Sequence, residues 1–326
     1  MTANVLRAGF LSSVQDLGRP GWREHGVTPS GALDAHALAV ANDLAGNEPS
    51  ATGIEFTSGT MRLRFADERV VAWCGGDFDA QAGGVAMPAG RAGVVHRDEE
   101  FQITPRRGSG RAWLAISGGI DVPAVLGSRA TDLRGKFGGF GGRPLSDGDA
   151  LPLGRATELA AHLPKLSGRI SPWSAPHEWA NTARPHPILR VIRGADWSRF
   201  EPDAQAAFFR GPFEVTEESD RMGVRLRGPE LARIDRSELL SEAVAPGTIQ
   251  VPPDGNPIVL LGDCQTLGGY PKIAHVITVD LPGAAQLGPG DEVRFVEVSL
   301  AEAHRWLLQR ARDLLWFRAG LALQNR

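Results

Sequence analysis

The stretch GTIQVPPDGNPIVLLGDCQTLGGYPKIAHVITV, residues 247–279, shows the pattern that decides the fold. It contains three short apolar runs, Thr248–Val251, Ile258–Leu261 and Ala274–Val279, and the first two are separated by Pro252-Pro253-Asp254-Gly255. Apolar runs of this length between Pro, Gly and Asp residues are typical of β-strands joined by tight turns.

The same pattern recurs along the rest of the chain of 326 residues. The 40 glycines and 23 prolines are spread out, which indicates many short elements. Strands in this number, without long crossover helices between them, predict a mainly β fold of the sandwich or barrel type. The further runs lie at Met61–Phe65, Val70–Trp73, Arg111–Ser117, Ile188–Ile192 and Glu292–Val298.

Two segments have helical periodicity instead. Asp34 can cap a helix that runs to Leu44 and ends before Gly46. Near the C-terminus, Ser299-x-x-Glu302 reads as a capping box that starts a second helix. We expect this C-terminal helix to pack an apolar stripe against a barrel, the stripe being formed by Leu300, Ala303, Leu307, Ala311 and Leu314.

A proline-rich stretch divides the chain into halves of similar size. Prolines at 172, 176, 185 and 187 disfavour helix, so residues 166–187 are expected to form an extended, irregular linker. The expected domains are therefore 1–165, a first β-barrel subdomain, and 188–326, a second one with the C-terminal helix. Pro144–Asp149 and Leu287–Asp291 both place Gly and Asp before a short strand, which fits either two related halves or two ordinary hairpin turns.

Charge and cysteine content exclude several classes of protein. The formal net charge is -3, and the arginines alternate with acids, so nothing favours nucleic acid or an anionic membrane as the main partner. Cys74 and Cys264 lie far apart and suit buried thiols better than a disulfide, with a catalytic thiol at Cys264 as the alternative. No signal peptide and no long apolar segment is recognisable, so we expect a cytoplasmic protein.

The densest group of reactive side chains is the segment Gly262–Lys272, which follows the run Ile258–Leu261. Gly268 and Gly269 allow backbone amides to approach a ligand closely. Lys272 can hold a carboxylate or phosphate as a point charge, although a surface lysine is the simpler interpretation. We therefore expect catalytic roles for Lys272, Gln265, Thr266 and Tyr270, and ligand contacts from Asp263, Gly268 and Gly269.

Two further groups are candidates for substrate binding. Gln15, Asp16, Arg19 and Asp34 lie among glycines near the N-terminus, where the alternative is a polar turn with Asp34 as a helix cap. Arg221 can contact a carboxylate through its forked guanidinium, with a surface ion pair as the alternative.

Motifs for phosphate and metal sites are incomplete. Gly135–Gly142 is rich in glycine, but no Ser or Thr follows Lys136, so it is not a Walker loop. Asp147-Gly148-Asp149 lacks the other ligands of a calcium loop, and no histidine pair has zinc-site spacing. The sequence predicts no metal site.

Further motifs occur in order along nearly the whole chain. They are Val14–Gly21, Gly26-Val27, Ser30–Ala32, Asp34, Gly118–Ile120, Leu126–Ser128, Thr131-Asp132, Gly142-Arg143, Gly148-Asp149, Asp220–Gly223, Gly247–Gly255 and Gln265–Ala274. Together these motifs resemble the allophanate hydrolase subunit 2 family, also called biotin-dependent carboxyltransferase-like, which includes one of the subunits of prokaryotic 5-oxoprolinase and KipA-like proteins. This chain departs from the family at Cys264, where relatives usually carry arginine, and at Leu267, where they carry a hydroxyl residue.

The resemblance implies two cyclophilin-like β-barrel subdomains and a role as one subunit of an ATP-dependent 5-oxoprolinase, a hydrolase that opens the lactam of pyroglutamate to glutamate. It implies two partners, a subunit 1 (KipI-like) protein and a third, lactam-utilisation subunit, with ATP acting through the complex. One alternative is the carboxyltransferase subunit of a biotin-dependent urea carboxylase, and only this alternative involves biotin. Another is a regulatory protein that binds and antagonises a kinase inhibitor.

Overall fold

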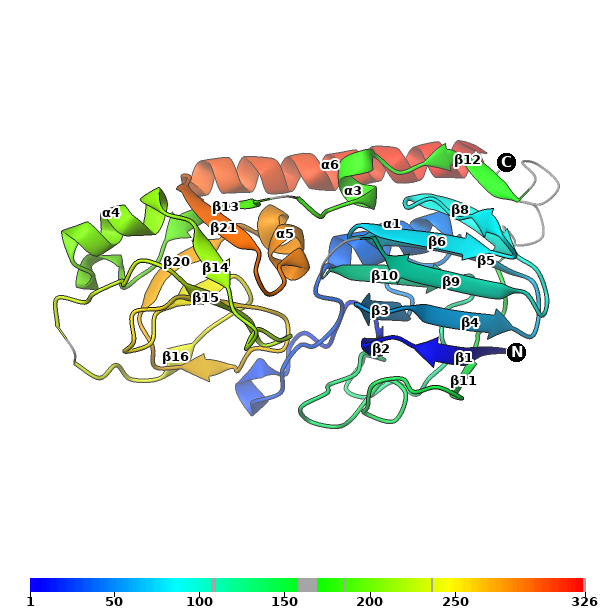
Figure 1. The fold of residues 1–326 in the computed structure, drawn as a ribbon, viewed down its shortest axis with the longest axis horizontal. Coiled ribbons are helices and arrows are strands. Elements are labelled where there is room, and N and C mark those ends of the chain that lie inside the picture. The colour runs from blue at the N-terminus through cyan, green and yellow to red at the C-terminus, as the bar shows by residue number, and fades with distance from the viewer. Residues whose placement is uncertain (107–109, 158–168, 185, 236, 325–326) are drawn as a thin grey trace. The chain divides into compact units, whose positions relative to one another are not determined.

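The computed structural model describes residues 1–106, 110–157, 169–184, 186–235 and 237–324. The chain forms two compact units (Figure 1). The first comprises Met1–Arg19, Ser30–Ala183 and Leu315–Arg326, and the second comprises Pro20–Pro29 and Arg184–Leu314. The predicted mainly β fold is confirmed: the first unit contains two six-stranded sheets and the second a closed barrel.

The first unit is built from two antiparallel sheets. One has the order β11 (Ala150–Pro152), β1 (Thr2–Ala8), β4 (Met61–Phe65), β9 (Glu100–Pro105), β6 (Phe78–Ala82) and β7 (Val85–Ala86). The other has the order β12 (Ile170–Ser174), β8 (Arg91–Val95), β5 (Arg69–Gly75), β10 (Arg111–Ile116), β3 (Gly53–Thr57) and β2 (Leu11–Gln15).

The two sheets of the first unit share one hydrophobic core. Leu63 and Phe101 from one sheet and Val71 and Leu114 from the other belong to the same buried cluster. Every residue of β5 is buried. Side chains point alternately to the two faces of a strand, so both faces of β5 must be covered. The second face of β5 and β10 is covered by helix α1 (Ala35–Leu44).

Helix α1 begins as the sequence predicts. The Asp34 carboxylate accepts a hydrogen bond from the Ala37 N–H at 2.8 Å and so caps the helix. The apolar residues Leu38, Val40 and Leu44 are buried, so this short helix is held mainly by packing on the sheet.

The stretch expected to be an irregular linker contains regular structure. Strand β12 and helix α3 (His177–Ala180) lie within residues 166–187, and both belong to the first unit. Pro176 stands at the N-cap of α3, outside the helix, so the prolines are compatible with these elements. Residues 166–168 and Pro185 lie outside the described residues.

The second unit is a closed seven-stranded barrel. Its last strand pairs in parallel with its first, at Leu189↔Phe295, which closes the sheet. The strand order is β13 (Ile188–Arg193), β20 (Lys272–Val276), β17 (Thr248–Gln250), β18 (Ile258–Leu260), β15 (Gly223–Arg227), β14 (Phe213–Val215) and β21 (Glu292–Glu297).

Shorter elements surround the barrel. Phe208 of α4 stacks on Phe295 of β21 with ring centroids 4.6 Å apart, so α4 closes one side of the barrel. The predicted strand Ala274–Val279 ends earlier, at Val276, because Thr278–Asp280 forms a 3-10 helix. These elements are β16 (Glu242–Ala243), β19 (Leu267–Gly268), η1 (Arg23–His25), η2 (Trp197–Arg199), α4 (Pro202–Arg210), η3 (Thr278–Asp280) and α5 (Leu281–Gln286).

Helix α6 (Leu300–Gln324) follows β21. The predicted capping box is confirmed, because the Glu302 carboxylate accepts from the Ser299 N–H at 2.9 Å and the Ser299 hydroxyl accepts from the Glu302 N–H at 3.2 Å. The predicted packing face is wrong, since Leu300 is 56% and Leu307 39% exposed.

Aromatic and arginine side chains form the face of α6 that makes contacts. Trp306 stacks under the Arg190 guanidinium at 4.2 Å, and Phe317 contacts Trp179 at 5.7 Å between ring centroids. Within each unit, an aromatic side chain of α6 thus makes a contact that the predicted Leu and Ala positions do not provide. Within the described residues, no helix is long and apolar enough to span a membrane.

Candidate functional site

The loop between β18 and β20 is anchored by a small ladder in the second unit. Glu242 of β16 pairs with Gly268 of β19, and the Val244 N–H donates to the Thr266 carbonyl at 3.2 Å. Residues 261–271 are therefore held at both ends by barrel strands, and in the middle by this two-residue ladder.

Lys272 is buried between two carboxylates. Its Nζ lies 3.3 Å from Oδ2 of Asp196 and 2.5 Å from Oε1 of Glu242. The backbone N–H of Lys272 also donates to Oδ2 of Asp196 at 3.0 Å. Both contacts are within ion-pair distance, so the buried ammonium is held by two carboxylates.

Two glutamines connect the loop to the barrel wall. Nε2 of Gln265 donates to Oε1 of Gln250 at 3.2 Å, and Nε2 of Gln250 donates to the Tyr270 carbonyl at 3.3 Å. A Cβ atom at Gly268 would lie 2.5 Å from Nε2 of Gln250. A side chain at position 268 would therefore displace the Gln250 amide from its contact with the Tyr270 carbonyl.

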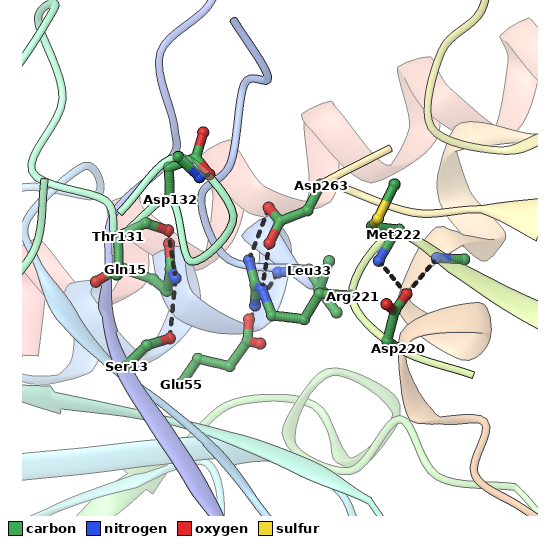
Figure 2. Close-up of polar contacts among 12 residues, drawn as sticks. Ser13, Gln15, Leu33, Glu55, Thr131, Asp132, Asp220, Arg221, Met222 and Asp263 are labelled. Carbon is green, nitrogen blue, oxygen red and sulfur yellow. Dashed lines mark hydrogen bonds and ion pairs between the residues drawn. The ribbon is translucent and has the colours of Figure 1, made fainter. Parts of the chain in front are cut away.

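Arg221 and Asp263 form a buried ion pair (Figure 2). Nε of Arg221 donates to Oδ2 of Asp263 at 2.8 Å, and both side chains are 5% exposed. Asp220 does not orient Arg221, because its carboxylate accepts from the Met222 N–H at 2.7 Å and the Gly223 N–H at 3.2 Å.

Arg23 brings a guanidinium to the other side of the loop. Its Nη2 donates to the Val244 carbonyl and, at 3.3 Å, to the Gln265 carbonyl. Burial raises the pKa of the neighbouring Cys264 thiol, and the positive charge of Arg23 lowers it in part. Cys264 is fully buried, so its thiol is unsuited to act as a nucleophile.

Two pockets lie in the second unit, next to the predicted loop. The larger, about 830 Å³, includes Glu217, Glu218 and Arg225 in its lining, and the smaller, about 460 Å³, includes Gly269 and Pro271. Tyr270 lines both pockets. Gln265, Thr266, Lys272 and Arg221 line neither of them.

The predicted residues of the N-terminal segment lie in the first unit, where Asp16 organises a turn. Its carboxylate accepts from the Gly18 N–H at 2.7 Å, the Ser128 hydroxyl at 2.6 Å and the Arg129 N–H at 2.6 Å. This arrangement ties the end of β2 to residues 128–129 and satisfies both carboxylate oxygens.

Gln15 and Arg19 lie against the segment that follows. Nε2 of Gln15 donates to the Ser13 hydroxyl at 2.9 Å and to the Thr131 carbonyl at 3.2 Å (Figure 2). Oε1 of Gln15 is buried and accepts no hydrogen bond from the described residues. The Arg19 guanidinium donates to the Ala130 carbonyl and stacks over the Phe137 ring at 4.8 Å.

The glycine-rich stretch Gly135–Gly142 packs on its own chain. A side chain at Gly139 would collide with Thr131, and one at Gly142 would collide with the Lys136 carbonyl. These glycines permit tight turns within the stretch. No cluster of three or more His, Cys, Asp or Glu side chains with metal-binding geometry occurs among the described residues.

The structure thus places Gln265, Thr266, Gly268, Gly269, Tyr270 and Lys272 on one loop of the second unit, with Arg221 and Asp263 as a separate pair. Sequence reasoning missed Asp196, Glu242 and Gln250. Of these three residues, Gln250 could have been found from the sequence, because it is a polar residue inside the apolar run Thr248–Val251. A buried amide in a strand needs a specific hydrogen-bond partner.

Residues 25–297 match the family described as carboxyltransferase domain, subdomains A and B. The chain belongs to this family.

Relatives of this carboxyltransferase-domain protein carry two kinds of name. It is 38% identical over 299 residues to a protein of Escherichia coli named as a subunit of 5-oxoprolinase, with 92% of each chain covered. It is 32% identical to urea amidolyase of Lachancea kluyveri, of which it covers 17%. The crystal structure of Kluyveromyces lactis urea carboxylase superposes with a TM-score of 0.87 at 30% identity, covering 98% of this chain and 29% of that one.

Proposed function

We propose that this carboxyltransferase-domain protein is one subunit of a multi-subunit 5-oxoprolinase that opens the lactam of 5-oxoproline to glutamate at the expense of ATP. The observation that supports the proposal is the match to the 5-oxoprolinase subunit of Escherichia coli at 38% identity over 92% of both chains. The two chains correspond nearly end to end, whereas the urea amidolyase contains the matched region as a small part of a much longer chain.

The proposed site is the loop Gln265–Lys272 with the residues beneath it. Lys272 would stabilise a ligand carboxylate or the oxyanion formed when the amide carbonyl is attacked, since a fixed charge is most effective in a buried site. Gln265, Thr266 and Tyr270 would orient the amide through hydrogen bonds, and Gly268 and Gly269 would let the backbone approach. Arg221 and Asp263 are proposed to shape the substrate site of the second unit, and Gln15, Asp16, Arg19 and Asp34 are proposed as substrate-binding residues of the first unit.

The larger pocket is unsuited to ATP. The larger pocket has Glu214, Glu217, Glu218 and Asp254 in its lining against Arg225 and Arg227, and this excess of acids would repel a triphosphate. The glycine-rich stretch packs on itself. We therefore propose that ATP binds to another member of the complex, made up of a subunit 1 (KipI-like) protein and a lactam-utilisation subunit.

Coexpression tests this proposal. The chain would be purified with its subunit 1 and lactam-utilisation partners and incubated with 5-oxoproline and ATP, and glutamate and phosphate would be measured. We expect both products to appear in equal amounts, and only when all three proteins and ATP are present. Glutamate formation by the complex lacking this chain would contradict the proposal.

A second candidate is the carboxyltransferase part of a biotin-dependent urea carboxylase. The TM-score of 0.87 with the Kluyveromyces lactis urea carboxylase favours this candidate. Only here would biotin take part, as the carrier of the transferred carboxyl group. Urea-dependent loss of carboxyl groups from carboxylated biotin carrier protein, with no reaction of 5-oxoproline, would select this candidate over the first.

A further inference from the structure

The Lys272 ammonium is buried in the second unit. Its side chain is 7% exposed, and Nζ forms ion pairs with Asp196 and Glu242. Taking an ammonium out of water without charged partners is costly, so a group that replaces one of these carboxylates has to be an anion itself.

The two carboxylates near Nζ differ in how firmly they are held. The Asp196 side chain is 12% exposed and accepts from the Lys272 N–H at 3.0 Å and from Nε of Arg199 at 3.1 Å. The Glu242 side chain is 60% exposed and approaches Nζ at 2.5 Å. Asp196 is therefore a fixed partner and Glu242 a weakly held one.

The backbone that carries Glu242 is also weakly held. Strand β16 has two residues, both exposed, and pairs only with the two-residue strand β19 among the described strands. Local separation of so short an exposed ladder has a low free-energy cost. A partly exposed ion pair contributes little stability, so the Glu242 carboxylate can leave Lys272 easily.

We propose that Lys272 is a binding site for the carboxylate of a small organic acid, and that Glu242 occupies this site until the ligand displaces it. This inference deepens the proposed function, on which it rests, because 5-oxoproline and glutamate both carry a carboxylate. Asp196 fixes the position of the ammonium and neutralises it, so binding requires exchange of one carboxylate for another. The smaller pocket, lined by Gly269, Tyr270 and Pro271, comes within one residue of Lys272.

The sequence offers a direct probe of this site, because the chain contains three lysines, Lys136, Lys165 and Lys272. Lysine labelled with ¹³C and ¹⁵N in the full-length chain gives side-chain NMR signals from these three residues only. The Lys272 signal is assigned by its loss in Lys272→Arg. The chain is titrated with 5-oxoproline and, as a matched neutral control, with 2-pyrrolidinone.

We expect 5-oxoproline to shift the Lys272 signal and 2-pyrrolidinone to leave it unchanged. Glu242→Gln removes the competing charge and should lower the Kd for 5-oxoproline about fivefold. Glu201→Gln removes the same charge from an exposed position that lines neither pocket and should leave the Kd unchanged, which separates displacement from a general effect of net charge.

The inference is overturned if 5-oxoproline leaves the Lys272 signal unmoved in both the natural chain and Glu242→Gln. It is also overturned if Glu242→Gln and Glu201→Gln change the Kd equally. A complex that consumes 5-oxoproline while the Lys272 signal stays unmoved contradicts this site and leaves the proposed function standing. Carboxylate binding at Lys272 in a complex without turnover supports the site and contradicts the function.

Discussion

Oδ2 of Asp196 accepts the backbone N–H of Lys272 at 3.0 Å and lies 3.3 Å from the ammonium of the same residue. One oxygen thus fixes both the backbone and the charge of Lys272. The contact joins the segment after β13 to the start of β20, two neighbouring strands of the barrel.

Replacement of Asp196 by asparagine should destabilise the second unit. Asparagine can still accept the backbone N–H, but it leaves the buried ammonium with Glu242 alone. We expect a loss of about 1–3 kcal/mol in the free energy of unfolding, measured by urea denaturation. Asp203→Asn, on the surface of α4, is the matched control and should have no effect beyond about 0.5 kcal/mol.

The Arg221–Asp263 pair should behave as a buried unit. Arg221→Met leaves the Asp263 carboxylate buried and uncompensated, which should cost about 3–5 kcal/mol. The double variant Arg221→Met, Asp263→Leu should be less destabilised than Arg221→Met alone. Additive losses in a double-mutant cycle would mean that the two side chains do not depend on one another.

His275 should give the barrel a stability that depends on pH. Burial lowers the pKa of His275 below its usual 6.5, and the charge of Lys272 lowers it further. The unfolded chain then binds the proton more readily than the folded one, so the free energy of unfolding falls as pH drops below about 6.5. The free energy of unfolding stops falling once the pH is below the pKa of His275 in the folded chain.

Urea denaturation between pH 5 and pH 8 measures this dependence. His275→Gln cannot bind the proton, and its unfolding free energy should change less across the same range. An identical pH profile for both proteins would show that His275 is not the group responsible.

Both thiols should be unreactive in the folded chain. Cys74 and Cys264 are fully buried, and burial raises the pKa of each thiol. Reaction with an aromatic disulfide reagent at pH 8 should be about a hundredfold slower in the native chain than in guanidinium chloride. Fast labelling of one thiol under native conditions, located by peptide mapping, would contradict the buried assignment.

Local signals in the sequence predicted much of the fold. The strand Met61–Phe65 has the predicted bounds, and Asp34 and Ser299 begin helices as their side-chain chemistry indicates. These features depend on residues within one turn or one strand of each other, so composition and spacing determine them.

Features that depend on distant residues could not be predicted in this way. The exposed Leu300 and Leu307 match a helical stripe, but Trp306 and Phe317 decide which face of α6 packs. Asp196 and Glu242 are far from Lys272 in sequence and reach it only through the barrel register and the β16–β19 ladder. No local pattern marks such a contact.

The central claim is that Lys272 acts on the substrate of a 5-oxoprolinase complex, and glutamate release by the reconstituted complex tests it most directly. Lys272→Ala should reduce the rate by on the order of a hundredfold, while the variant still copurifies with its partners. Lys136→Gln removes an exposed lysine and should retain full activity. If Lys272→Ala assembles normally and releases glutamate at nearly the natural rate, the loop Gln265–Lys272 is a structural turn and the site assignment is wrong.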